Sequence, residues 1–174
     1  MVSRQMPMTN DTDVTHIPDR TCHTGAVDSL PMDVDWHPWE YVGERFPHII
    51  ICTSYELESG VRGLAQGNRI WLCKTLDQAG RRTTLSHEIL HFERGIVPQP
   101  RHSMYTRREE RIVDRLAARR LIPLPKLIDA LRWSSQPAEL ADALWTTERM
   151  VECRMNALDP IEVAELENSL DDGW

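Results

Sequence analysis

The stretch TLSHEILHFERG, residues 84–95, contains the pattern H-E-x-x-H, formed by His87, Glu88 and His91. Its surroundings predict a helix over residues 81–94 that ends at Gly95. Residues four apart share one face of a helix, so His87 and His91 can direct their imidazoles at one metal ion. Glu88 lies about 100° further round the helix, where a carboxylate can hold a water beside that ion and act as a base. The alternative is a helix with two surface histidines, and a third ligand decides between the two interpretations.

A catalytic zinc site takes three ligands from the protein and keeps one position open. The metzincin pattern fails here because Arg94 stands where that pattern requires Gly, and Val97 where it requires His. A Glu on the following helix, with an Asp four residues later, does fit, and Glu110 and Asp114 have this spacing. Glu110 is then the third ligand, and Asp114 accepts the free ring N–H of a ligand histidine.

The predicted helix over residues 106–122 places these two carboxylates on its apolar side. Positions 110, 114, 117 and 121 share one face, which carries Glu, Asp, Ala and Leu, whereas three arginines share another: Arg111, Arg115 and Arg119. A carboxylate on the core-facing side of a helix is costly unless it is paired or bound to metal. The position of Glu110 and Asp114 on this face is stronger evidence for a role at the metal site than their spacing alone.

Two weaker sources of a third ligand stay open. Glu167 and Asp171 have the same spacing, but they lie at the end of the last predicted helix, beside Asp172. His102 lies in the loop between the two site helices, where a histidine is more often simply exposed.

Composition limits the class of protein. The chain has 174 residues, enough for one domain or one domain with a small appendage, and 41% of them are hydrophobic. A net charge of −7 argues against DNA binding through phosphate neutralisation. No apolar run is long enough for a membrane span, and the N-terminus has no secretory signal, so a cytoplasmic protein is expected. The four cysteines are scattered and are expected to be reduced thiols.

The fold class predicted is α+β, with a small sheet of about three strands. Residues 1–35 lack aliphatic periodicity and are predicted to form a poorly ordered tail. Gly67-Asn68 separates two β-prone runs, 61–66 and 69–74, and predicts a two-residue hairpin after a first strand over 48–54. Further helices are predicted over 125–133, 138–145, 147–157 and 160–170. An extended substrate could add a strand beside residues 69–74, or that strand could be an ordinary covered core strand.

Two segments of the sequence resemble a known protein family. GLAQGNRIWLCKTLDQAGRRTTLSHEILH, residues 63–91, resembles the strand pair and HE-containing helix of the ImmA/IrrE metallopeptidases. EERIVDRLAARRLIP, residues 109–123, is similar to the next signature of that family. The resemblance covers residues 45–125 and is weaker over 126–158, which resembles the family's trailing helix-turn-helix-like segment. The chain departs from the usual pattern at four positions: Leu90, Val113, Leu116 and Arg120.

The resemblance implies an intracellular zinc protease with one Zn²⁺ per chain, of a kind found in phages, mobile elements and stress responses. It implies a zincin-like catalytic domain over 36–125 and a helical region over 126–174. His87, His91 and Glu110 would bind zinc, Glu88 would be the general base, and Asp114 would orient a ligand histidine. The implied substrate is a DNA-binding transcriptional repressor, which the protease cleaves or inactivates.

One further donor is expected to hold the oxyanion that forms on the scissile carbonyl. His102, Tyr105 or an arginine within 101–108 can supply it, because all of them lie between or at the start of the site helices. None of them is preferred over the others.

Two other classes of function stay open. The helices over 138–157 could form a DNA-binding helix-turn-helix, although the charge of −7 and the acidic residues of these helices make direct nucleic-acid binding unexpected. The acidic residues are Glu139, Asp142, Glu148 and Glu152. Alternatively, a zinc-containing regulator could sequester its target without cutting it.

Overall fold

The structure is a computed structural model that describes residues 36–95 and 104–171. The predicted tail over 1–35 and the loop residue His102 lie outside the described residues. The side chains of residues 104–106, including that of Tyr105, also lie outside them.

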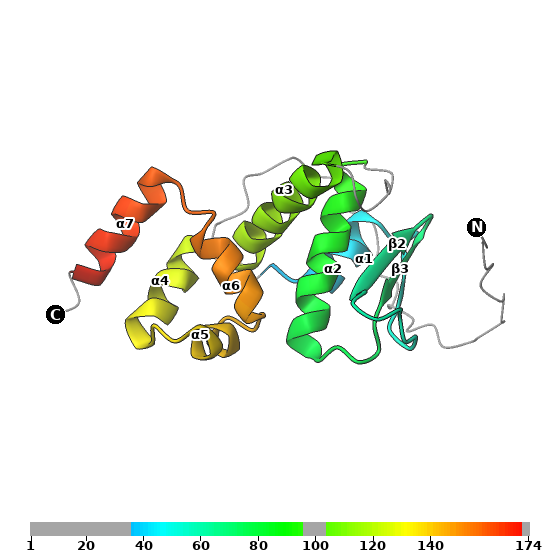
Figure 1. Cartoon of the computed structure of the whole chain (residues 1–174), viewed down its shortest axis with the longest axis horizontal. Coiled ribbons are helices and arrows are strands. Elements are labelled where there is room, and N and C mark those ends of the chain that lie inside the picture. The colour runs from blue at the N-terminus through cyan, green and yellow to red at the C-terminus, as the bar shows by residue number, and fades with distance from the viewer. Residues whose placement is uncertain (1–35, 96–103, 172–174) are drawn as a thin grey trace.

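Within these ranges the fold is α+β, as predicted, with seven helices and one three-stranded sheet. The elements are α1 (Pro38–Arg45), β1 (Ile50–Cys52), β2 (Gly63–Gln66), β3 (Arg69–Leu72), α2 (Gln78–Glu93), α3 (Met104–Leu121), α4 (Leu124–Trp133), α5 (Pro137–Ala143), α6 (Glu148–Met155) and α7 (Pro160–Asp171). The sheet and α7 lie at opposite ends of the long axis, with α2 and α3 between them (Figure 1). No helix in the described part of the chain combines the length and the apolar character needed to cross a membrane.

The predicted hairpin is confirmed. β2 and β3 pair antiparallel, and Gln66 opposite Arg69 closes a two-residue turn. Gly67 in that turn has a φ of 60°, which a residue without a Cβ adopts at little cost. Burial alternates along β3, because Ile70 and Leu72 are buried while Trp71 between them is only half-buried.

The sheet order is β1-β3-β2, so β3 is the central strand. β1 pairs with it in parallel and β2 pairs with it antiparallel. Of the two alternatives for residues 69–74, the structure supports a covered core strand and excludes the docking of a substrate strand beside β3, because both sides of β3 are already paired. Among the described strands, the edge that faces α2 and the candidate site is that of β2.

Helix α2 ends where the sequence predicts, at Gly95 with a φ of 62°, but it begins three residues earlier than expected. The side chain of Asp77 caps it by accepting a hydrogen bond of 2.7 Å from the Gly80 N–H. The predicted start of α7 is confirmed, since the Asp159 side chain accepts from the Glu162 N–H and the Glu162 carboxylate accepts from the Asp159 N–H.

Helix α2 lies between two hydrophobic cores. Leu85 and Ile89 pack with Ile70 and Leu72 of the sheet in the smaller core. Leu90 belongs instead to the larger core, which α3, α4, α5 and α6 complete. Packing on both sides fixes the rotation of α2, and with it the direction of the histidines on its remaining face.

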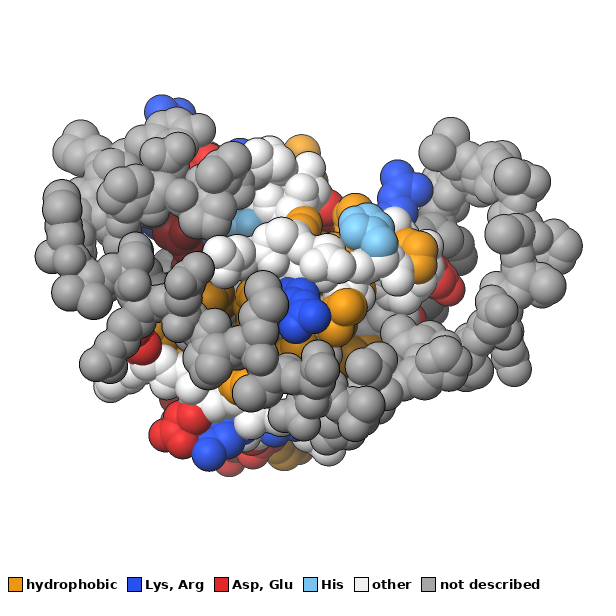
Figure 2. Space-filling model, turned by 90° about the vertical axis from the view of Figure 1, so that its right-hand side faces the viewer, with side chains coloured by type: hydrophobic (Ala, Val, Ile, Leu, Met, Phe, Trp, Pro, Cys, Tyr) orange, Lys and Arg blue, Asp and Glu red, His pale blue; other side chains and the backbone are white. Residues whose placement is uncertain are grey.

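The end of the molecule that carries the sheet is shown in Figure 2, where hydrophobic side chains gather at the centre of the face. Trp71 and Leu64 form a cross-strand pair on this side, because the alternation in β3 turns Ile70 and Leu72 toward α2. Helix α2 therefore covers one face of the sheet and does not cover the other.

Candidate metal centre

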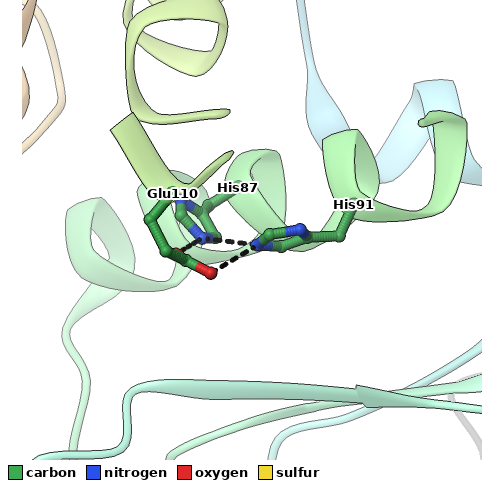
Figure 3. Close-up of side chains that lie close together, drawn as sticks. All are labelled: His87, His91 and Glu110. Carbon is green, nitrogen blue, oxygen red and sulfur yellow. Dashed lines mark hydrogen bonds and ion pairs between the residues drawn. The ribbon is translucent and has the colours of Figure 1, made fainter. Parts of the chain in front are cut away.

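Helices α2 and α3 bring together three side chains that could hold a metal ion. His87 and His91 lie one turn apart on α2, and Glu110 reaches toward them from α3 (Figure 3). All three are partly buried, and their ligand atoms lie within 4.8 Å of one another. The group of residues predicted from the sequence is thus assembled in space and could hold a metal ion.

The donor atoms lie close to the spacing of a small tetrahedral site, with two of the three distances slightly shorter than such a site has. His87 Nε2 lies 3.0 Å from His91 Nε2 and 3.1 Å from Glu110 Oε2, and His91 Nε2 lies 3.5 Å from Glu110 Oε1. In a tetrahedral zinc site with bonds of about 2.0–2.2 Å, neighbouring ligand atoms lie about 3.3–3.5 Å apart. Two imidazoles and one carboxylate are also a donor set that zinc uses when it keeps a fourth position open.

Asp114 orients one of the histidines. Its Oδ1 lies 3.0 Å from His87 Nδ1, so that nitrogen donates its proton to Asp114 and leaves Nε2 directed at the other donors. The second oxygen, Oδ2, accepts a hydrogen bond of 2.8 Å from Arg149 of α6. The residue predicted to orient a ligand histidine is therefore in place, and a residue of the C-terminal region holds it there.

The charges of the group are coupled. Burial lowers the pKa of His87, but hydrogen bonds to Asp114 and Glu110, together with the charge of Glu88, outweigh burial and raise that pKa from 6.5 to about 9. Hydrogen bonds from His87 and His91 hold the pKa of Glu110 well below its usual range. Without a metal ion, an imidazolium balances these carboxylates at neutral pH, and a divalent cation would take over that role.

Glu88 lies beside the group and against the sheet. Its side chain is half-buried and follows His87 on α2. A Cβ placed on Gly63 would come within 2.8 Å of Glu88 Oε1 and within 2.5 Å of the Thr84 methyl carbon. The carboxylate of Glu88 therefore packs against the backbone of β2, and only glycine at position 63 leaves room for it.

The weaker ligand candidates are not brought to the histidines. Glu167 and Asp171 are exposed on α7, which packs against α4, and α2 is not its neighbour. His102 and the side chain of Tyr105 lie outside the described residues, so the choice of an oxyanion donor stays a prediction.

Sequence reasoning missed two residues of the site, Arg149 and Gly63. Arg149 is 35 positions away from Asp114, on another helix, and no local pattern links the two. Gly63 lies within a short β-prone run, where a glycine often marks a place at which another group comes close to the backbone, and this signal could have been tested.

Comparison with known proteins adds no relative, because no family model, no curated protein and no solved structure matches the chain. The resemblance to ImmA/IrrE metallopeptidases therefore stays a prediction that rests on the quoted motifs.

Proposed function

We propose that the protein is a zinc-dependent metallopeptidase with a zincin-like fold, of the ImmA/IrrE kind. Its substrate would be an intracellular protein, namely a DNA-binding transcriptional repressor. The observation that carries the proposal is the convergence of His87, His91 and Glu110, with donor spacings suited to zinc.

The chemistry follows from the neighbours of that group. A zinc ion held by these three residues supplies a Lewis acid that brings the pKa of a coordinated water toward about 7. Glu88 is the residue placed to accept the proton of the attacking water and to return it to the leaving amine. Asp114 keeps the His87 ring in the tautomer whose Nε2 is directed at the site.

The edge of β2 is the surface that suits an extended substrate. Strand pairing alternates, and Arg62 accepts a hydrogen bond from the Cys73 N–H, so Gly63 and Ala65 turn their N–H and C=O groups away from β3. A peptide paired with this edge would run past Gly63, against which Glu88 packs. Main-chain pairing would then bring a peptide bond to the base without requiring a particular side chain.

The region after residue 125 supports protein binding better than DNA binding. Helices α5 and α6 pack against each other, as a helix-turn-helix requires. Four carboxylates on them are exposed, however, and would repel a phosphate backbone. These are the four acidic residues predicted to stand against a DNA-binding role: Glu139, Asp142, Glu148 and Glu152.

The test compares Glu88→Gln with the matched control Glu44→Gln, a change at an exposed residue of α1. Zinc content is measured first. Because neither substitution changes His87, His91 or Glu110, we expect both variants and the parent chain to bind one zinc. Zinc-loaded Glu88→Gln is then used to capture proteins from the source cells, and each captured protein is incubated with the parent chain. We expect cleavage by the parent chain and by Glu44→Gln, and none by Glu88→Gln.

Two other results would contradict the proposed function. A Glu88→Gln variant that keeps zinc and still relieves repression, with the repressor intact, would contradict proteolysis and favour sequestration. If the parent chain holds no zinc and the His87→Ala variant behaves as the parent does, the assignment of the whole metal site is contradicted.

A further inference from the structure

A row of arginines runs along the solvent side of α3. Its members are exposed and recur at helical spacing: Arg107, Arg108, Arg111 and Arg115. The three acidic residues of the helix point elsewhere, because Glu109 pairs with Arg94 while Glu110 and Asp114 belong to the candidate metal centre. This face of α3 therefore carries positive charge only.

The row borders the candidate metal centre. Arg111 lies three positions before Asp114, and residues three apart are neighbours on a helix surface. Arg149 of α6 reaches the same place, since it donates to Asp114 Oδ2 at 2.8 Å while 73% of its side chain stays exposed. We call these five residues the arginine ridge: Arg107, Arg108, Arg111, Arg115 and Arg149.

The ridge residues of α3 lack acidic partners, in contrast to the other arginines of that helix. Arg119 pairs with Asp159 and Glu162, and Arg120 pairs with Glu93. Within the described part of the chain, the ridge arginines of α3 form no ion pair, and the side chain of Arg111 bonds only a backbone carbonyl of its own helix. The chain has 27 acidic and 20 basic residues, so a cluster of unpaired arginines is not a consequence of composition.

We propose that the arginine ridge binds an acidic segment of the protein substrate, next to the bond that is cut. Guanidinium groups match carboxylates with two parallel hydrogen bonds, and the four ridge arginines of α3 can accept a partner without losing an ion pair to another described residue. Arg149 keeps its bond to Asp114, and its exposed side chain adds positive charge beside them. The proposal rests on the proposed peptidase function, because it takes the bound protein to be a substrate. Binding to the ridge can be measured separately from cleavage.

An acidic protein segment fits this surface better than a nucleic acid does. A duplex extends well beyond four or five arginines, and α6, which supplies Arg149 and packs against α3, also exposes Glu148 and Glu152. Those carboxylates would repel the phosphates that follow along the backbone. A short acidic peptide segment can contact the ridge and end before it reaches them.

The test uses the full-length Glu88→Gln variant loaded with zinc, so that a bound peptide is not cut. Its probes are two fluorescein-labelled peptides of equal length, which differ only in four Asp and Glu residues replaced by Asn and Gln, and a labelled DNA duplex. Fluorescence anisotropy is measured at low and high salt. We expect the acidic peptide to bind about tenfold more tightly at low salt, because each exposed ion pair contributes little and several must add up. The preference should shrink at high salt, because salt screens exposed charges.

The ridge is removed by combining Arg107→Gln, Arg111→Gln and Arg115→Gln, none of which touches the metal-binding group. The matched control combines Arg45→Gln, Arg69→Gln and Arg132→Gln, which are exposed and cause the same change in net charge. The ridge variant should lose the preference for the acidic peptide, and the control should keep it. Equal binding of both peptides, an unchanged preference in the ridge variant, or tighter binding of the DNA duplex would each overturn the proposal.

A second measurement separates this proposal from the peptidase itself. The zinc-loaded parent chain digests a mixture of peptides of random sequence, and the cut sites are sequenced. Cleavage without enrichment of Asp or Glu near the cut would overturn the ridge proposal and leave the peptidase intact. Ridge-dependent binding of the acidic peptide without any cleavage would support the ridge and count against the peptidase.

Discussion

His87 contacts two carboxylates of the candidate metal centre, and its proton is the positive charge that the proposed zinc ion would replace. Its pKa of about 9 lies above the ordinary value of 6.5, because the bonds to Asp114 and Glu110 outweigh burial. Its bonds therefore stabilise the folded metal-free protein fully below about pH 6.5, and this contribution is lost as the pH rises through about 9. Zinc binds the neutral imidazole, so binding must release that proton.

The apparent affinity for zinc should consequently rise with pH. Between pH 6.5 and 8.5 we expect the association constant to increase about tenfold per pH unit, through the single proton of His87. Competition with a chromophoric chelator, corrected for the chelator's own protonation, measures this slope. An affinity that stays constant over that range would mean that His87 is neutral in the metal-free protein.

The close packing around Gly63 leads to a second prediction about a single residue. A methyl group at this position would meet Glu88 Oε1 at 2.8 Å and the Thr84 side chain at 2.5 Å, so Gly63→Ala must displace both of them or shift the strand. Overpacking of this kind costs about 1–3 kcal/mol. We expect the proposed peptidase activity to fall while zinc binding persists, because the three atoms nearest to the new methyl group belong to Thr84 and Glu88 and not to a metal-binding residue.

The control for that change is Gly67→Ala. Gly67 has a φ of 60°, so the substitution also strains the backbone, but a Cβ there would meet nothing within 4 Å. Both variants should unfold at lower temperature, and only Gly63→Ala should lose turnover per folded molecule. Wild-type turnover in Gly63→Ala would show that Glu88 does not depend on this contact.

At the scale of elements, local signals explain what the sequence could predict. The Gly67-Asn68 turn and the Gly95 helix end are each determined by the backbone conformations that glycine allows, and both are confirmed. The residues of the site could be predicted because each helix places its own pair four residues apart, His87 with His91 on α2 and Glu110 with Asp114 on α3. Arg149 could not be predicted, because its partner Asp114 is fixed by the packing of α6 on α3 rather than by spacing.

The buried side of α2 carries a second long-range connection. Arg82 is 5% exposed and donates to the carbonyl oxygens of Leu144 and Trp145 at the end of α5, at 3.3 and 3.0 Å. Its guanidinium also lies over the Trp145 ring, 5.2 Å from the centroid, and Trp145 has an unusual positive φ of 48°. Arg82 thus caps α5 and holds the turn to α6 against the metal-binding helix.

Replacement of Arg82 by Met should therefore destabilise the protein by about 3 kcal/mol, since buried carbonyls lose bonds to a charged donor. Arg81→Met is the matched control, because among the described residues the Arg81 side chain bonds only the exposed Lys74 carbonyl oxygen, and its loss should cost under about 1 kcal/mol. Urea unfolding followed by circular dichroism measures both values. Equal losses in the two variants would show that the Arg82 bonds do not hold the α5–α6 turn.

At the scale of the whole molecule, the catalytic and C-terminal regions predicted from the sequence share one core. Leu90 of α2 and Val113 of α3 pack in the same cluster as Leu127, Met150 and Val151, all of which follow residue 125. Two departures from the family pattern, Leu90 and Val113, are thus core residues, which is consistent with a role in packing. The helices after residue 125 also reach the candidate metal centre itself, through Arg149.

Arg149 provides the prediction that tests this connection. It holds Asp114, which in turn fixes the His87 ring, so Arg149→Gln should weaken zinc binding by about tenfold, as changes around ligand histidines typically do. Arg149→Lys should recover part of the loss, because it keeps the charge but not the planar pairing. A structural defect alone would not follow this order.

The decisive measurement is a double-mutant cycle with Asp114→Asn, read as zinc affinity. If Arg149 acts through Asp114, then Arg149→Gln has little further effect once Asp114 has lost its charge, and the two losses do not add. Arg132→Gln is the control, since Arg132 pairs with exposed Asp129 on α4 and should leave zinc affinity unchanged. Fully additive losses in the cycle would contradict the connection, because the C-terminal helices would then affect zinc binding by a route that does not pass through Asp114.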